Sequence, residues 1–90
     1  MSNSRYTVEV KRSAQKAFSA LPSDDQKQIA EKLLSLETDP FQPGCKKISG
    51  RANTWRIRAG SYRIVYEVRE NVLIVIVIRI GHRREIYRNL

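Results

Sequence analysis

The sequence predicts an α+β domain with the element order β-α-α-β-β-β. Three observations lead to this class: a short alternating segment opens the chain, two amphipathic helical stripes follow it, and three strand-like segments fill the second half. Helices that precede a run of strands are typical of a helical hairpin packed on one face of a small, mostly antiparallel sheet. The 90 residues provide one modest core, so we expect residues 1–90 to form a single domain.

The chain is expected to begin with a strand and a short helix. Residues 6–10, YTVEV, alternate and are rich in β-forming side chains, which predicts the strand. The next apolar residues are spaced as on one face of a helix, and they are Ala14, Ala17, Phe18 and Leu21. Pro22 has no backbone N–H and is expected to end this helix.

A second, longer helix is predicted from Ser23 to about Thr38. Ser23 and Gln26 have the spacing of a capping box, and the acids between them suit the positive end of a helix dipole. The apolar stripe of this helix is Ile29, Ala30, Leu33, Leu34 and Leu36. Residues 39–53 are rich in Pro and Gly and are expected to form a loop, which is either a solvated connection or a guide for phosphate groups. Its basic residues are Lys46, Lys47 and Arg51.

The first strand of the second half is predicted over residues 54–59, TWRIRA. Strict alternation places Trp55 and Ile57 on one face and Arg56 and Arg58 on the other. We expect the face with the apolar residues to pack on the helical hairpin. The opposite face then carries the arginines.

Two further strands are expected to complete the sheet. Gly60-Ser61 predicts a two-residue hairpin turn into residues 62–68, YRIVYEV. In that strand Tyr62, Ile64, Tyr66 and Val68 share one face, and Arg63, Val65 and Glu67 share the other. Residues 72–80, VLIVIVIRI, contain no polar side chain before Arg79, which predicts a central strand covered on both sides.

The basic residues are distributed unevenly along a chain of net charge +8. Residues 51–90 carry nine basic side chains against three acids, and all nine are arginine. Arginine presents a planar fork of donors that matches phosphate oxygens, whereas lysine would serve solubility equally well. Because the helical hairpin covers one sheet face only, we expect the other face to present Arg56, Arg58, Arg63 and Arg79 to a polyanion.

Other classes of protein are not indicated. The longest apolar run, residues 72–78, is too short to span a bilayer, and residues 1–5 do not resemble a signal peptide. One cysteine, Cys45, and one histidine, His82, make a poor supply of metal ligands. We therefore expect a cytoplasmic protein with no membrane segment, no metal and no cofactor.

Two segments, WRIRAGSYRIVYEV (55–68) and IRIGHRREIY (78–87), resemble the RelE/ParE toxin superfamily and, more closely, the RelE-type mRNA endoribonucleases of toxin–antitoxin pairs. The resemblance extends over nearly the whole chain in element order. It implies the RelE-like microbial RNase fold. It also implies cleavage of mRNA in the ribosomal A site, in which a ribose 2′-OH attacks the adjacent phosphate and leaves a 2′,3′-cyclic phosphate without a metal.

The resemblance also implies the residues of the site. The two basic positions before the hairpin turn of the family correspond to Arg56 and Arg58, and its phosphate clamp corresponds to Arg63. The basic residue soon after the family's glycine corresponds to Arg83, the general acid or transition-state stabiliser. The late aromatic residue corresponds to Tyr87, which would stack on a base.

One position departs from the family pattern. The best-known members have a lysine at the position of Arg58, and that lysine is the proposed general base. An arginine has a pKa above about 12 and is a poor base. Histidine and carboxylate side chains can exchange protons near neutral pH, and His82 and Glu85 are candidates for acid–base work. The other possibility is catalysis by electrostatics and positioning, with water or a ribosomal group taking the proton.

Three functions remain open from the sequence. The first is a ribosome-dependent endoribonuclease toxin that forms a hetero-oligomer with a short antitoxin, and that binds operator DNA only through the antitoxin. The second is a ParE-like inhibitor of DNA gyrase with the same fold, since a fold alone does not determine function. The third is a catalytically degenerate RNA-binding module.

Overall fold

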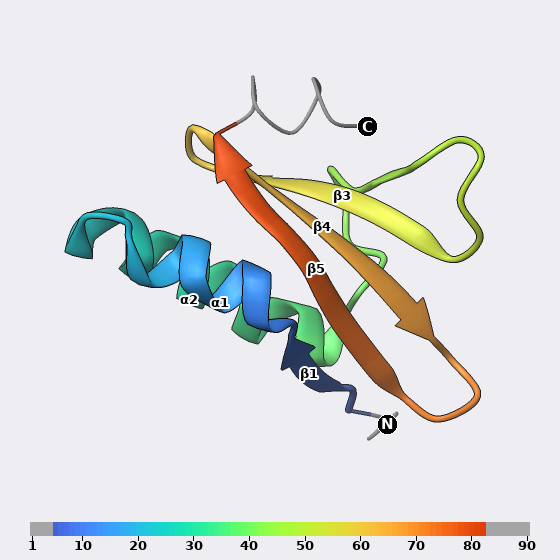
Figure 1. Cartoon of the computed structure of the whole chain (residues 1–90). Helices are drawn as coiled ribbons and strands as arrows, with labels where there is room; N and C mark the ends of the chain where they lie inside the picture. Colours follow the sequence, from blue (N-terminus) through green and yellow to red (C-terminus); the bar gives the residue numbers. More distant parts are fainter. Residues whose placement is uncertain (1–4, 83–90) are drawn as a thin grey trace.

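The computed structural model describes residues 5–82 and confirms the α+β prediction (Figure 1). The elements are β1 (Thr7–Val10), α1 (Arg12–Ser19), α2 (Ser23–Thr38), β2 (Lys46–Lys47), β3 (Thr54–Ala59), β4 (Tyr62–Arg69) and β5 (Ile74–His82). The strand β2 was not predicted, because two residues are too few to show alternation. It lies inside the segment that the sequence assigned to a loop.

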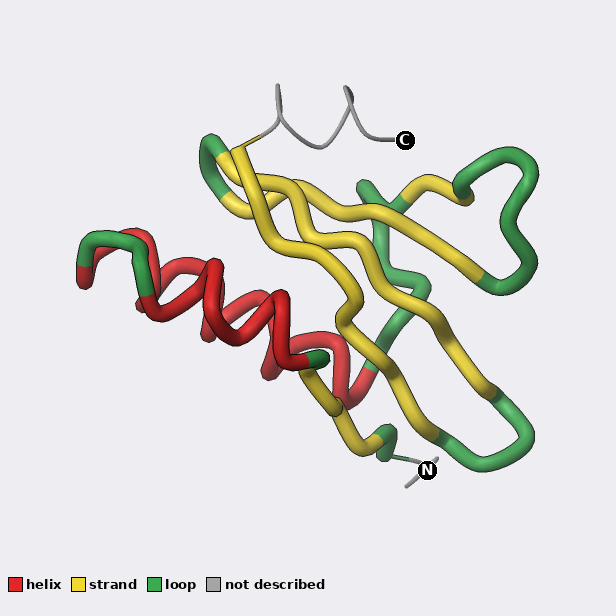
Figure 2. Tube along the Cα trace, in the orientation of Figure 1, coloured by secondary structure: helices red, strands yellow, loops and turns green. Residues whose placement is uncertain are grey.

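The strands form one sheet in the order β1-β5-β4-β3-β2 (Figure 2). The pair β1–β5 is parallel, and the other three pairs are antiparallel. The two helices lie side by side on one side of the sheet (Figure 1), and α1 packs mainly on β5. Neither helix covers the opposite face of the sheet. In residues 5–82 no helix is both long enough and apolar enough to cross a membrane.

The turn between β3 and β4 is the predicted two-residue hairpin, with Ala59 paired to Tyr62. Gly60 has φ 63°, a left-handed conformation that suits glycine. The side chain of Gln28 on α2 occupies the space that a Cβ at this glycine would need. The turn is therefore fixed both by its backbone conformation and by its contact with the helix.

The predicted capping box is wrong. Ser23 is the first helical residue after Pro22, and no side chain caps the amino end of α2. Gln26 instead reaches back to the preceding helix. Its Nε2 donates to the carbonyl oxygens of Phe18, Ser19 and Leu21, at 3.1, 3.3 and 3.1 Å. The break between the helices is short, so this amide supplies additional hydrogen bonds to the carbonyl groups at the end of α1 and in the break.

One residue of the predicted apolar stripe on α2 does not belong to the core. Leu34 is 62% exposed, whereas Ile29 and Leu36 on the same helix are fully buried. The stripe is therefore narrower than the sequence pattern indicated.

The strand β5 contains one extra residue, Ile78. Val65 pairs with Arg79, but the next residue, Tyr66, pairs with Val77, so Ile78 is bulged out of the register. The bulge changes which side chains face the helices, because the register on either side of it differs by one. The strand also begins later than predicted, since Val72 and Leu73 are exposed in the preceding turn.

Tyr66 joins the core to the segment that follows α2. Its ring is fully buried, and its hydroxyl donates to the carbonyl oxygen of Pro40 at 2.7 Å. Burial raises the pKa of the Tyr66 phenol well above its ordinary value, so the hydroxyl keeps its proton and remains a donor. This bond holds the start of the long β2 connection against the sheet.

We expect Tyr66→Phe to lower the free energy of unfolding by about 1–2 kcal/mol at neutral pH, because the buried carbonyl loses its donor. Above pH about 10 the difference should shrink by about 1.4 kcal/mol per pH unit. In that range the unfolded wild-type chain loses the phenol proton while the folded chain retains it, so wild-type stability falls and the Phe variant escapes this loss. Urea unfolding at several pH values measures both effects.

Tyr6→Phe is the matched control for this experiment, since Tyr6 is half-buried against the same core. An equal loss of stability in both variants would contradict the role assigned to the Tyr66 hydroxyl.

Candidate phosphate-binding site on the open face of the sheet

The pairing register gathers basic side chains on the face that the helices do not cover. Residues directly opposite each other in neighbouring strands point to the same face of a sheet. The row that crosses β2, β3, β4 and β5 is Lys46, Arg56, Val65 and Arg79. The next row is Arg58, Arg63 and Gly81. Five cations thus lie within two adjacent rows.

A pocket of about 270 Å³ opens among these side chains. The lining residues that the structure describes are Gly44, Lys46, Arg56, Ile57, Arg58 and Arg63. Four of these six are cations and none of the six is a carboxylate. Clustered guanidinium groups bind phosphate oxygens through charge-assisted, often bidentate hydrogen bonds. The arrangement therefore suits an anionic, phosphate-bearing ligand.

The cations of the pocket lie at different depths. Arg63 is 8% exposed, Arg56 is half-buried, and Arg58 and Lys46 are exposed. A buried guanidinium is held by its surroundings and loses little freedom when a ligand arrives, whereas exposed ones can adjust to it. Arg63 is thus the fixed floor of the site. Arg58 and Lys46 form its adaptable rim.

Two predicted RNA-binding residues lie elsewhere. Lys47 pairs with Trp55, so it belongs to the face on which the helices pack. Arg51 is exposed in the turn before β3 and does not line the pocket. Lys46, Arg56 and Arg79, by contrast, share one row on the open face.

His82 does not join the predicted arginines. It pairs with Tyr62, and the two rings meet edge to face with their centroids 5.8 Å apart. The Tyr62 hydroxyl in turn donates to Oδ2 of Asp25 on α2 at 3.1 Å. This places the His82 side chain on the helix-covered face, whereas Arg58 and Arg63 point to the other. The predicted residues Arg83, Glu85 and Tyr87 lie outside the described residues.

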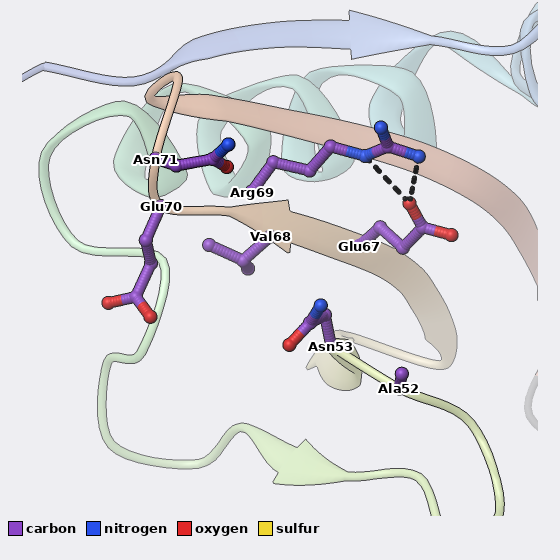
Figure 3. Close-up of a pocket in the computed structure, with 7 residues that line it drawn as sticks. All are labelled: Ala52, Asn53, Glu67, Val68, Arg69, Glu70 and Asn71. Atoms are coloured by element: carbon purple, nitrogen blue, oxygen red, sulfur yellow. Dashed lines mark hydrogen bonds and ion pairs between the residues drawn. The ribbon is translucent and has the colours of Figure 1, made fainter.

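A second pocket, of about 500 Å³, lies at the opposite end of the β3–β4 hairpin (Figure 3). Its lining residues are Ala52, Asn53, Glu67, Val68, Arg69, Glu70 and Asn71. Arg69 donates to Oε1 of Glu67 from both Nε and Nη2 at 3.2 Å (Figure 3). Its acids outnumber its one cation, so it does not suit a phosphate.

Nowhere in residues 5–82 do three His, Cys, Asp or Glu side chains gather as a metal site would require.

The sequence did not reveal how Lys46 and Gly44 reach the site. Lys46 was predicted to contact RNA from a loop, but it is fixed beside Arg56 by the short strand β2. Gly44 contributes a left-handed turn with φ 98° at the mouth of the pocket. The Pro43-Gly44 dipeptide in the sequence was the available signal for such a turn.

Comparison with known proteins finds toxins of toxin–antitoxin systems. The family model described as ParE toxin of type II toxin–antitoxin system, parDE, matches residues 5–87. An Escherichia coli protein named as a RelE-like toxin is 33% identical over 81 residues, which cover 88% of this chain and 84% of that protein. Toxin RelG of Mycobacterium tuberculosis is 29% identical over 84 residues, which cover 92% of this chain and 97% of that protein. A chain in the solved toxin–antitoxin complex RelBE2 of the same organism has a TM-score of 0.78 at 26% identity. The match covers 88% of this chain and 99% of that chain.

The cations of the pocket predict that RNA binding depends on salt concentration. The affinity for a short single-stranded RNA should fall steeply with salt, and Arg58→Gln should reduce the slope of log affinity against log salt by about 0.7, the loss of one phosphate contact. Fluorescence anisotropy between low and physiological salt measures this slope. Arg69→Gln removes the same charge outside the pocket and should leave the slope close to that of the wild type. Equal slopes for both variants would mean that general charge, and not this pocket, binds the RNA.

Proposed function

We propose that this chain, which belongs to the RelE/ParE family of type II toxin–antitoxin toxins, is a metal-independent endoribonuclease that cleaves mRNA on the ribosome. The observation that carries the proposal is the pocket in which Arg56, Arg58 and Arg63 meet, where the described lining residues include four cations. An inhibitor that acts only by binding another protein does not need three guanidinium groups around one cavity. Stabilising a phosphate that gains negative charge during a reaction does require such a cluster.

The arrangement suits attack by a ribose 2′-OH on the adjacent phosphate. The phosphorus becomes five-coordinate and its non-bridging oxygens gain negative charge in the transition state. Arg63, at the floor of the pocket, would hold one of these oxygens in a fixed position. Arg56 and Arg58 would neutralise the charge that develops, which is the contribution that preorganised donors make best.

Residues on either side of the pocket extend the proposed substrate site. Arg79 lies in the same row as Arg56, two strands away, and would bind a neighbouring phosphate of the RNA. By the family resemblance, Arg83 would donate to the leaving 5′-oxygen and Tyr87 would stack on a base. His82 has no part in this proposal, because it lies on the helix-covered face.

We infer that the chain acts in the cytoplasm and is held inactive by an antitoxin of its own in a hetero-oligomer. The similar RelBE2 chain of Mycobacterium tuberculosis was solved in such a complex. The open face here carries five cations in two rows, so an acidic, partly disordered antitoxin segment would gain much from charge pairing as it folds onto the toxin. Binding to operator DNA would occur only through the antitoxin.

Inhibition of DNA gyrase is the second candidate function, and the ParE description of the matching family model favours it. This alternative predicts growth arrest with intact mRNA. A degenerate RNA-binding module, the third reading, predicts RNA binding with neither arrest nor cleavage. Brief induction of the chain in cells, followed by primer extension on an abundant mRNA, separates all three.

We expect cuts confined to translated frames in the wild type, and at least about 100-fold fewer cuts with Arg63→Ala or Arg83→Ala, the usual scale for losing a charge-stabilising donor. Arg69→Ala, outside the pocket, is the matched control and should cut normally. Thermal unfolding and copurification with the antitoxin test whether the Arg63→Ala chain folds, and Arg58→Ala gives an independent variant at an exposed position. Full toxicity of both Arg63→Ala and Arg83→Ala would show that the site assignment is wrong.

A further inference from the structure

The pocket supplies charge, but its arginines cannot supply a base. Attack by a 2′-OH requires that its proton be taken, and a guanidinium stays protonated at any pH that the protein tolerates. Among the described residues that line the pocket, Lys46 is the one side chain with a nitrogen that can exist unprotonated as a nucleophilic or basic amine. We propose that Lys46 is the general base of the reaction. This inference rests on the proposed function.

The register places Lys46 where a base is needed. Lys46 pairs directly with Arg56, and residues so paired have their Cβ atoms about 5 Å apart on the same face. Lys47, one residue later, points to the opposite face beside Trp55. The chain thus carries two adjacent lysines of which one reaches the pocket.

The strand β2, which carries Lys46, is short, but contacts on both sides hold it in place. On its C-terminal side, the backbone N–H of Ile48 donates to the carbonyl oxygen of Thr54 at 2.9 Å. On its N-terminal side, the Tyr66 hydroxyl donates to Pro40, and the ring of Phe41 packs edge-on against Trp55 with centroids 5.1 Å apart. A two-residue strand alone would fray. These contacts fix the position of its backbone.

The side chain of Gln42 ties the same segment to α2. Its Nε2 donates to Oγ of Ser35 at 3.0 Å, and its Oε1 accepts from Nζ of Lys32 at 3.4 Å. The segment from Pro40 to Gln42 is therefore attached both to the sheet and to the helix. Lys46 follows it on a positioned backbone, as a catalytic group requires.

The mouth of the pocket next to Lys46 is open. Gly44 lines it with no side chain, and apart from its two chain neighbours no described residue has a heavy atom within 4 Å of the place where a Cβ would be. A nucleotide backbone can therefore approach Lys46 closely. The charged groups that face the lysine are Arg56 and Arg58 from β3 and Arg63 from β4, with no carboxylate among the described lining residues.

The neutral amine of Lys46 takes the proton of the 2′-hydroxyl and becomes an ammonium. The 2′-oxygen forms a bond to the adjacent phosphorus, and the bond from phosphorus to the 5′-oxygen breaks. The 5′-oxygen leaves with a proton from water or from a neighbouring donor, and the products are a 2′,3′-cyclic phosphate and a 5′-hydroxyl. Lys46 then returns its proton to solvent.

The test separates a base from a mere charge. Purified chain is mixed in excess with ribosomes carrying a defined mRNA, and single-turnover cleavage is followed from pH 6 to pH 9. Lys46→Arg keeps the positive charge but removes the base, so it should cleave at least about 100-fold more slowly, the lower end of what general bases contribute. Lys47→Arg, the matched control on the opposite face, should leave the rate and its pH profile unchanged.

Chemical rescue provides a second readout. With Lys46→Ala, added ethylamine should restore cleavage in proportion to the concentration of its neutral form, whereas tetramethylammonium, a cation that cannot take a proton, should not. Restoration by both compounds, or a Lys46→Arg rate equal to that of the wild type, would overturn the proposed role of Lys46 and leave the endoribonuclease proposal standing. Absence of cleavage by the wild-type chain would overturn both.

Discussion

One extra residue in β5 controls how the open face is built. Upstream of the bulge, Val75 and Val77 face the helices, and a regular strand would carry Arg79 into the same apolar layer. An unpaired guanidinium there would cost several kcal/mol, on the order of other buried charges. The bulge at Ile78 shifts the phase by one, so that Ile80 enters the core and Arg79 joins Arg56 on the open face. The same shift places Gly81 beside Arg63.

The arrangement of the candidate site is expected to lower the stability of the sheet. Lys46 lies directly opposite Arg56, and Arg58 directly opposite Arg63, and like charges so paired destabilise a sheet. Val65, fully buried between Arg56 and Arg79 in the same row, provides an apolar base over which their long side chains can lie. A bound polyanion would offset the repulsion. Local repulsion of this kind is common at functional sites, where it serves binding and opposes folding.

Local patterns predicted the parts of the structure that depend on local geometry. Strict alternation identified the arginine face of β3 and β4, and the Gly60-Ser61 turn joined them as expected. The bulge and β2 were missed because both depend on the neighbouring strand and not on the segment's own pattern. The misplacement of His82 has the same origin: it is a sequence neighbour of Arg83, yet its pairing with Tyr62 sends its side chain to the helix side.

Stability and the site are connected through Tyr66. Its buried hydroxyl holds Pro40, and from Pro40 the chain passes within six residues to Lys46 on the wall of the pocket. Tyr66 also follows Val65 on β4 and is the residue at which pairing with β5 changes register. One side chain therefore lies where the bulge begins and where the β2 connection is anchored. Its contacts connect the part of the open face on β5 with the part on β2, so the positions of Arg79 and Lys46 relative to Arg56 depend on the same part of the core.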